Sequence, residues 1–158
     1  KLDEPWDSPN NKKLISRMPA IFANPNSKMS RDSGKTSIHV FVGNNNTPGR
    51  HADFGNNTPF GIGTTGCRFR DITDGTSNTL MAVEVGDDKA EIWTKPGGLP
   101  FDPKGNPLEL LGKLSAGHFL ALFADGSIRQ ISTRISPETL RNLIQRNDGK
   151  VVEDEDIP

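Results

Sequence analysis

The chain has 158 residues, of which 16 are glycines, 12 are prolines and only 32% are hydrophobic. This length and composition favour one domain with a modest core, short strands and long loops, and they argue against a helical bundle. The formal net charge is −1, with acidic and basic residues interspersed, so no charge field favours nucleic acid or an anionic membrane.

The first predicted element is a short helix near the N-terminus. Ser8 can cap it, and Pro9 suits its first position. The helix has a short apolar stripe, formed by Leu14, Ile15 and Met18.

A β-branched stretch then predicts a strand over residues 37–42. The polar segment that follows, about 43–66, contains the near-repeats NNNTPG and GNNTPFG and predicts one long loop of paired turns. Loops of this length are uncommon in compact domains, so we expect function or mobility to concentrate there.

The second half predicts more strands and a second helix. The pattern gives a buried strand over 79–85, a short strand over 90–94, a Pro/Gly loop over 96–107 and one helical turn over 108–114. Ser136 and Pro137 begin the C-terminal helix, and Gly149 is predicted to end it. The apolar face of this helix consists of Leu140, Leu143 and Ile144.

The stretch HFLALFADGSIRQIS, residues 118–132, predicts a hairpin that turns at Asp125-Gly126. A two-residue turn would pair Phe123 with Ile128 and Leu120 with Ile131. In that register Ile128 shares a face with Phe119, Ala121 and Phe123, whereas Ile131 shares the other face with Leu120 and Leu122. The first strand is apolar on both faces and is predicted to be central. His118 then lies too far along the strand to contact Asp125.

The order of these elements predicts an α+β fold with a mainly antiparallel β-sheet, a short N-terminal helix, a C-terminal helix and long Gly/Pro/Asn-rich loops. We expect one globular domain over residues 1–150. The acidic end, 151–158, is predicted to be a solvated tail.

A second Asp-Gly turn concentrates oxygen-bearing side chains, namely Asp71, Asp74, Thr76, Ser77 and Asn78. Calcium takes six to eight oxygen ligands, so Asp71, Asp74, Thr76 and Asn78 are candidate calcium ligands. The spacing of these residues does not fit an EF-hand. The favoured interpretation is a metal-free turn stabilised by Asx and Ser/Thr hydrogen bonds.

Two further sets of side chains suggest alternative functions. Trp6 and Trp93, with the Asn/Thr-rich loops, are candidate contacts for a small solute or glycan, although a tryptophan is more often part of a core. A metal-dependent hydrolase would have to use His39, His51, His118 and Asp53, but their spacing lacks an HExxH-like pattern.

Four stretches of the chain together resemble a known family. They are LDEPWDSPNNKKLISRMPAIF, FRDITDGTSNTLMAVEV, IWTKPGGLPFDPKGNPLELLG and LFADGSIRQIS. In content and order they resemble the domain of unknown function 1559, a group of prepilin-like proteins expanded in planctomycete bacteria and sometimes catalogued as a solute-binding-type family. The chain departs from the family pattern at Ser115, where histidine is frequent, at His118, where glycine is usual, and at 23–25, where Cys-Pro is frequent.

The resemblance implies a pilin- or pseudopilin-like head exported from the cytoplasm, with a hydrophobic helix upstream as its only link to the membrane. Its implied partners are other pilin-like subunits or cell-surface components. Some pseudopilins bind calcium, but their ligands do not map onto this sequence, so we expect no cofactor beyond the candidate calcium ion at 71–78. The resemblance implies no catalytic residue. We therefore expect a non-enzymatic extracytoplasmic structural or surface protein.

Overall fold

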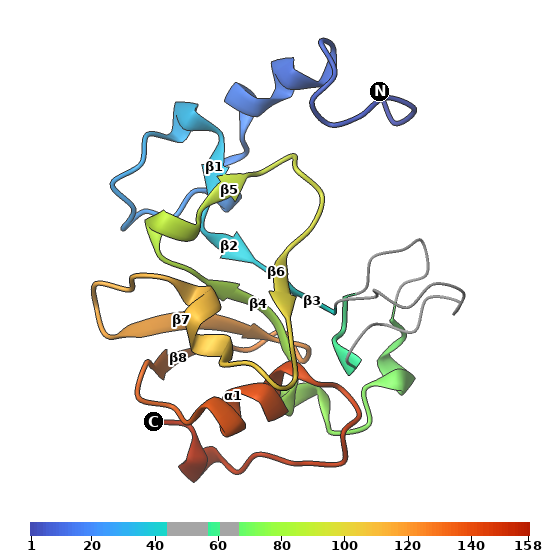
Figure 1. Cartoon of the computed structure of the whole chain (residues 1–158), viewed down its shortest axis with the longest axis vertical. Helices are drawn as coiled ribbons and strands as arrows, with labels where there is room; N and C mark the ends of the chain where they lie inside the picture. The colour runs from blue at the N-terminus through green and yellow to red at the C-terminus, as the bar shows by residue number, and fades with distance from the viewer. Residues whose placement is uncertain (44–56, 61–66) are drawn as a thin grey trace.

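The structure, a computed structural model, describes residues 1–43, 57–60 and 67–158. Its strands are β1 (Lys35–Thr36), β2 (Ile38–His39), β3 (Phe41–Gly43), β4 (Leu80–Glu84), β5 (Glu91–Ile92), β6 (Leu99–Phe101), β7 (His118–Phe123) and β8 (Ile128–Ser132). Its α-helix is α1 (Pro137–Ile144), and 3-10 helices span Asn11–Arg17, Ala20–Phe22, Arg31–Ser33, Phe69–Asp71, Thr76–Asn78, Asp87–Lys89, Pro107–Leu111 and Asp154–Asp156. The N-terminal segment lies at one end of the molecule, and α1 lies at the other (Figure 1).

These strands form mainly antiparallel sheets, which confirms the predicted α+β class. The largest sheet has the order β2-β4-β7-β8, and all its neighbours are antiparallel. Strands β1 and β5 form a second antiparallel pair, whereas β3 and β6 pair in parallel. As predicted, β7 is central and β8 lies at the edge.

One face of the large sheet, the inner face, carries the core. Phe119, Ala121 and Phe123 of β7 are fully buried there. Side chains from several elements join them in one cluster, including Phe41, Leu80, Val83, Val85, Leu99, Phe101, Leu111, Ile131, Ile135, Leu140, Leu143, Ile144 and Val152. Each Leu or Ile buried in this way contributes about 1.5–3 kcal/mol to stability.

The opposite, outer face of the sheet leaves apolar side chains in solvent. Leu120 and Leu122 alternate with the buried residues of β7 and are 46% and 38% exposed. Ile128 of β8 lies opposite Leu122 and is 68% exposed. Ile38 of β2 is also exposed and lies opposite Glu84. We call Ile38, Leu120, Leu122 and Ile128 the outer apolar face.

The hairpin forms at the predicted position, but its predicted register is wrong by one residue. Phe119 pairs with Ile131 and Leu122 with Ile128, because the turn contains three residues, 124–126, closed by Phe123 N–H donating to the Ser127 carbonyl. Of the three turn residues, Gly126 is the one in the left-handed conformation, with φ of 86°. A shift of one residue exchanges the faces of a strand, so Ile131 and not Ile128 shares the buried face of Phe119, Ala121 and Phe123, and Ile128 is exposed beside Leu122.

The strand predicted over 37–42 is divided between two partners. β2 pairs with β4, whereas β3 pairs with β6, which lies in the segment predicted to be a Pro/Gly loop. Gly98 permits this second pairing, because a Cβ at Gly98 would lie 2.4 Å from the Val40 carbonyl oxygen. The predicted strands at 79–85 and 90–94 correspond to the shorter β4 and β5.

The predicted helices form, with changes at their ends. The N-terminal one is a 3-10 helix that begins at Asn11, whose N–H donates to Ser8 Oγ at 3.0 Å. The Ser136 side chain caps α1 by accepting from Thr139 N–H, as predicted. Gly149 does not end α1, which stops at Ile144, and lies instead in a later turn.

The acidic segment 151–158 packs against the domain instead of extending into solvent as a tail. Val152 is buried in the core, and Ile157 packs beside it. The carbonyl of Pro158 accepts a hydrogen bond of 2.8 Å from the Ser132 N–H at the end of edge strand β8.

The hairpin turn gives the first test. Gly126→Ala would place a Cβ in open space but on a left-handed backbone, which costs an L-residue about 1–2 kcal/mol. We expect urea unfolding to show a loss of stability of about that size. Gly105→Ala is the matched control, since its backbone is not left-handed and its Cβ would make ordinary contacts at 3.5 Å. Equal stability of the two variants would contradict the three-residue turn.

Candidate functional site

The oxygen-rich turn at 71–78 is hydrogen-bonded to the turn that follows α1. Asp74 is only 5% exposed, and both oxygens of its carboxylate accept backbone hydrogen bonds. Oδ2 accepts from Asp148 N–H at 2.7 Å, and Oδ1 accepts from Gly149 N–H at 3.0 Å. Hydrogen bonds from backbone N–H groups to a buried carboxylate are among the stronger ones in proteins.

Arg146 strengthens this connection from the other side. Its carbonyl accepts from the N–H groups of Thr73 and Asp74, at 2.9 and 3.2 Å. Its guanidinium Nη1 donates to the Asp71 carbonyl at 2.8 Å. The turn and the segment after α1 therefore form one hydrogen-bonded unit.

The four candidate calcium ligands lie in this one turn, where the carboxylates of Asp71 and Asp74 accept backbone hydrogen bonds and Thr76 and Asn78 are held through their backbones. The Asp71 carboxylate accepts from Arg68 N–H at 3.0 Å, and the Thr76 carbonyl accepts from Asp125 N–H at 3.1 Å. Asn78 donates its N–H to the Gly75 carbonyl. Within residues 1–43, 57–60 and 67–158, no group of three or more His, Cys, Asp or Glu side chains is placed to hold a metal ion. Calcium stays a prediction, and these hydrogen bonds give the turn a structural role.

The structure separates the two histidines that it describes. His39 lies opposite Val83, a core residue, so its side chain is on the inner side of the sheet. His118 begins β7 on the same side as Leu120, which belongs to the outer face. These two imidazoles cannot share a metal ion across the sheet. His51 and Asp53, the other candidates for a hydrolase site, lie outside the described residues.

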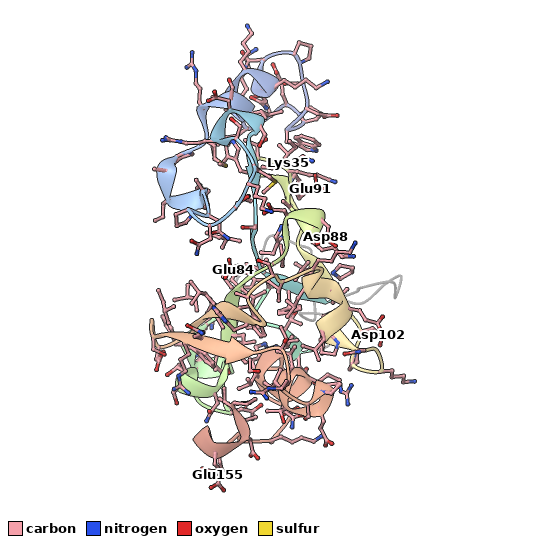
Figure 2. The ribbon with its side chains drawn as sticks, turned by 90° about the vertical axis from the view of Figure 1, so that its left-hand side faces the viewer. Lys35, Glu84, Asp88, Glu91, Asp102 and Glu155 are labelled. Atoms are coloured by element: carbon pink, nitrogen blue, oxygen red, sulfur yellow. The ribbon has the colours of Figure 1, made fainter. Side chains whose placement is uncertain are left out.

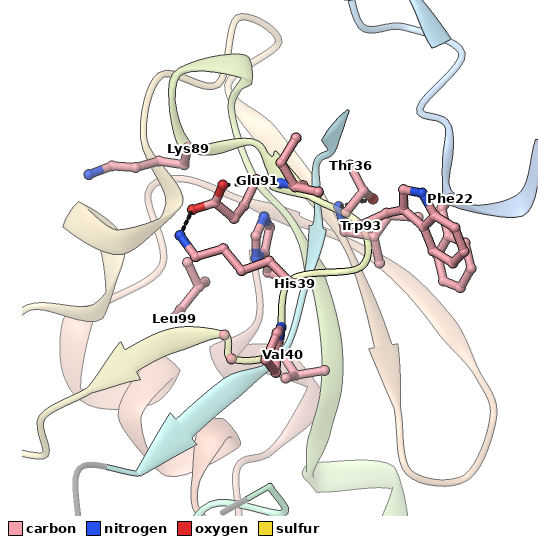
Figure 3. Close-up of a pocket in the computed structure, with 14 residues that line it drawn as sticks. Phe22, Thr36, His39, Val40, Lys89, Glu91, Trp93 and Leu99 are labelled. Carbon is pink, nitrogen blue, oxygen red and sulfur yellow. Dashed lines mark hydrogen bonds and ion pairs between the residues drawn. The ribbon is translucent and has the colours of Figure 1, made fainter. Parts of the chain in front are cut away.

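A pocket with a volume of about 330 Å³ lies beside the β1–β5 pair (Figure 3). Trp93 and Phe22 form one end of it, with ring centroids 5.8 Å apart and planes inclined by 24°. Glu91 and Lys95 form an ion pair at the other end. Between them lies His39, whose Nε2 is buried and has no hydrogen-bond partner among the residues that the structure describes. Burial lowers the pKa of His39, opposed by the hydrogen bond that the imidazole donates to the Thr36 backbone carbonyl and by the charge of Glu91.

Of the two tryptophans considered as ligand contacts, only Trp93 lines this pocket. Its indole Nε1 donates to the Ile15 carbonyl at 3.0 Å, so the N-terminal segment holds the ring in place. Trp6 is half-buried and precedes the first 3-10 helix. No local pattern pointed to Phe22, because its ring reaches Trp93 only through the folding of the N-terminal segment.

A second hollow, of about 440 Å³, lies beside the outer face. His118 and Glu84 are among its lining residues. The Glu84 carboxylate is engaged there, because Oε1 accepts from Asn24 Nδ2 at 2.5 Å and Oε2 accepts from Leu120 N–H at 3.2 Å. Figure 2 shows Glu84 well separated from the Lys35 and Glu91 side chains near the first pocket.

The fold and these sites define a small α+β domain with two open hollows and a hydrogen-bonded oxygen-rich turn. Residues 2–113 match the family described as protein of unknown function (DUF1559), which carries a solute-binding-type label, and the chain belongs to this family. The match contains the Trp93 pocket and the oxygen-rich turn, and it ends before the β7–β8 hairpin. Neither the curated proteins nor the solved structures contain a match to this chain. None of the helices that the structure describes has the length and apolar character needed to span a bilayer.

The Asp74 hydrogen bonds give a test of the structural role. Asp74→Ala would remove the two hydrogen bonds that the N–H groups of Asp148 and Gly149 donate to a buried carboxylate, at a cost of about 1–3 kcal/mol each. We expect a loss of about 2–5 kcal/mol in urea unfolding, irrespective of added calcium. Asp3→Ala, at an exposed position, is the control and should stay near wild type. A calcium-dependent difference between wild type and Asp74→Ala would show that the turn holds the ion.

The buried imidazole predicts a dependence of stability on pH. Because burial lowers the pKa of His39 in the folded state, the unfolded chain binds more protons once the pH falls below about 6.5. This contribution to stability is present above that pH and is lost on acidification. His39→Gln should therefore reduce the fall in melting temperature between about pH 7.5 and pH 5. His118→Gln is the matched histidine control, and an equal effect of both variants would contradict the assignment to His39.

Proposed function

We propose that this protein is a non-enzymatic, extracytoplasmic structural or surface protein of the pilin-like kind. Its proposed partners are other pilin-like subunits or components of the cell surface. The observation that carries this proposal is the outer apolar face of the large sheet. Four apolar side chains are exposed on this face, and Ile128 is the most exposed of them.

An exposed apolar patch on a small domain is the kind of surface that proteins use to contact one another. Here the patch lies on a rigid sheet whose other face is filled by the core, so its side chains are held in fixed positions. The resemblance to prepilin-like proteins supports the same proposal, because it implies a globular head that is exported from the cytoplasm. The near-neutral net charge gives no repulsion between copies.

Two carboxylates that could serve in chemistry support a non-enzymatic role, because their oxygens are used in folding. The Asp74 carboxylate binds two backbone N–H groups, and the Glu84 carboxylate binds Asn24 and the backbone of Leu120. A reacting centre instead needs an acid, a base and a nucleophile that converge on a free position.

A second candidate function is a binding module for a small solute or glycan. Trp93 favours it, because this residue and Phe22 lie at the edge of a pocket of ligand size. The solute-binding-type label of the family agrees with this candidate.

The first proposal is tested with the full-length reading frame expressed in its native cells. A membrane-impermeant amine reagent should label the protein on intact cells, and crosslinking should trap it with neighbours. Ile128→Glu should reduce the crosslinked fraction several-fold, because it places a charge in the outer apolar face. Leu2→Glu, at a fully exposed leucine outside this face, is the control. Labelling only after lysis, or crosslinking that Ile128→Glu leaves unchanged, would contradict the proposal.

A further inference from the structure

The pocket beside β1 and β5 has walls from segments that are far apart in the sequence. Strand pairing places Thr36 opposite Glu91. Trp93 N–H donates to the Gly34 carbonyl at 3.0 Å, and Leu99 N–H donates to the Val40 carbonyl at 2.8 Å. These backbone bonds fix both ends of the segment 91–99, so the pocket is largely formed before any ligand arrives.

One end of the pocket presents a hydrogen-bond donor beside an acceptor. The Lys95 ammonium is paired with Glu91 Oε2, while Glu91 Oε1 accepts from Ile92 N–H at 3.1 Å. The hydrogen bond from Lys95, and then that from Ile92 N–H, lower the pKa of Glu91, so the carboxylate is charged at neutral pH. The side chains of Lys95 and Glu91 are 43% and 45% exposed, so a ligand can reach both. His39 Nε2 adds a buried polar atom that no residue in the described ranges hydrogen-bonds.

The other end of the pocket is flat and apolar. The Phe22 ring stacks on the Trp93 indole, and the indole is oriented by its bond to the Ile15 carbonyl. Ile38, also exposed, extends this surface. Figure 3 shows the stacked rings on one side of the pocket and the Glu91 carboxylate on the other, with His39 between them.

These features select the chemistry of the ligand. A free anion would be repelled by Glu91, and a free cation by Lys95, so the ion pair favours a neutral molecule that donates and accepts hydrogen bonds. An aromatic surface favours a molecule that also has an apolar face. A pyranose sugar has both, since its hydroxyl groups lie around a ring whose C–H groups form a flat apolar face. The volume of about 330 Å³ lies at the small end of ligand pockets and suits a monosaccharide or disaccharide.

We propose that the pocket formed by Phe22, His39, Glu91, Trp93 and Lys95 binds a neutral pyranose sugar. The sugar ring packs against the Phe22–Trp93 pair, and its hydroxyl groups bind the Glu91 carboxylate and the Lys95 ammonium. This proposal rests on the second candidate function and names the class of solute that the module takes.

The two tryptophans of the chain make the test direct. In a Trp6→Phe variant, Trp93 is the only indole, so fluorescence reports on the pocket alone. This variant is titrated with the methyl glycosides of glucose, galactose, mannose and N-acetylglucosamine. We expect at least one of them to produce a saturable change in Trp93 fluorescence. In this background Lys95→Ala should weaken that binding at least about tenfold, because one hydrogen-bonding partner is lost. Lys104→Ala, at an exposed position in another turn, should not weaken it.

Circular dichroism and urea unfolding of each variant establish that it is folded. No saturable change with any glycoside, or binding that Lys95→Ala leaves intact, would overturn the sugar proposal. A thermal-shift screen of the wild-type protein with amino acids, carboxylates, phosphate and divalent metals separates this failure from failure of the second candidate function. A shift with one of these solutes alone overturns the sugar and keeps the binding module. No shift with any solute, together with no glycoside response, overturns both.

Discussion

The alternation of side chains along β7 is the constraint on which the rest of the structure depends. Phe119, Ala121 and Phe123 fill the core, and the residues between them face outward. β4 and β8 pair with β7 on its two sides, so the register of β7 decides which side chains of its neighbours are buried. The three-residue turn at 124–126 sets the β8 register, and through it buries Ile131 and exposes Ile128. Both the core and the outer apolar face therefore depend on one turn.

Local signals in the sequence were sufficient for part of this fold. The capping Ser136, the Pro137 that follows it and the apolar spacing predicted α1, because these interactions lie within a few residues. Asp125-Gly126 located the hairpin but not its register, since Asp-Gly suits both two- and three-residue loops. The division of the segment 37–42 between β4 and β6 depends on distant partners, and β6 contains a proline that argues against a strand.

The candidate sites, like the fold, could be predicted from the sequence only in part. The composition of 71–78 indicated a turn, but the partners of Asp74 are 74 and 75 residues away and carry no signal of their own. Trp93 was recognisable as a candidate because an indole is a large amphipathic surface. Its position in a pocket, unlike that of Trp6, depends on Phe22 and on the β1–β5 pairing. The sequence shows which residue types suit a ligand. Only the fold shows which of the two tryptophans lies beside the other residues of a pocket.

The position of the last residues affects how the sheet can associate. An edge strand presents unpaired N–H and C=O groups, and a strand from another chain can add to them. In this domain the Pro158 carbonyl accepts a hydrogen bond from the N–H of Ser132, and Ile157 packs against the core. Residues 157–158 thus act as a cover over one end of the β8 edge. They disfavour open-ended strand addition at that end, while the outer apolar face of the sheet stays exposed.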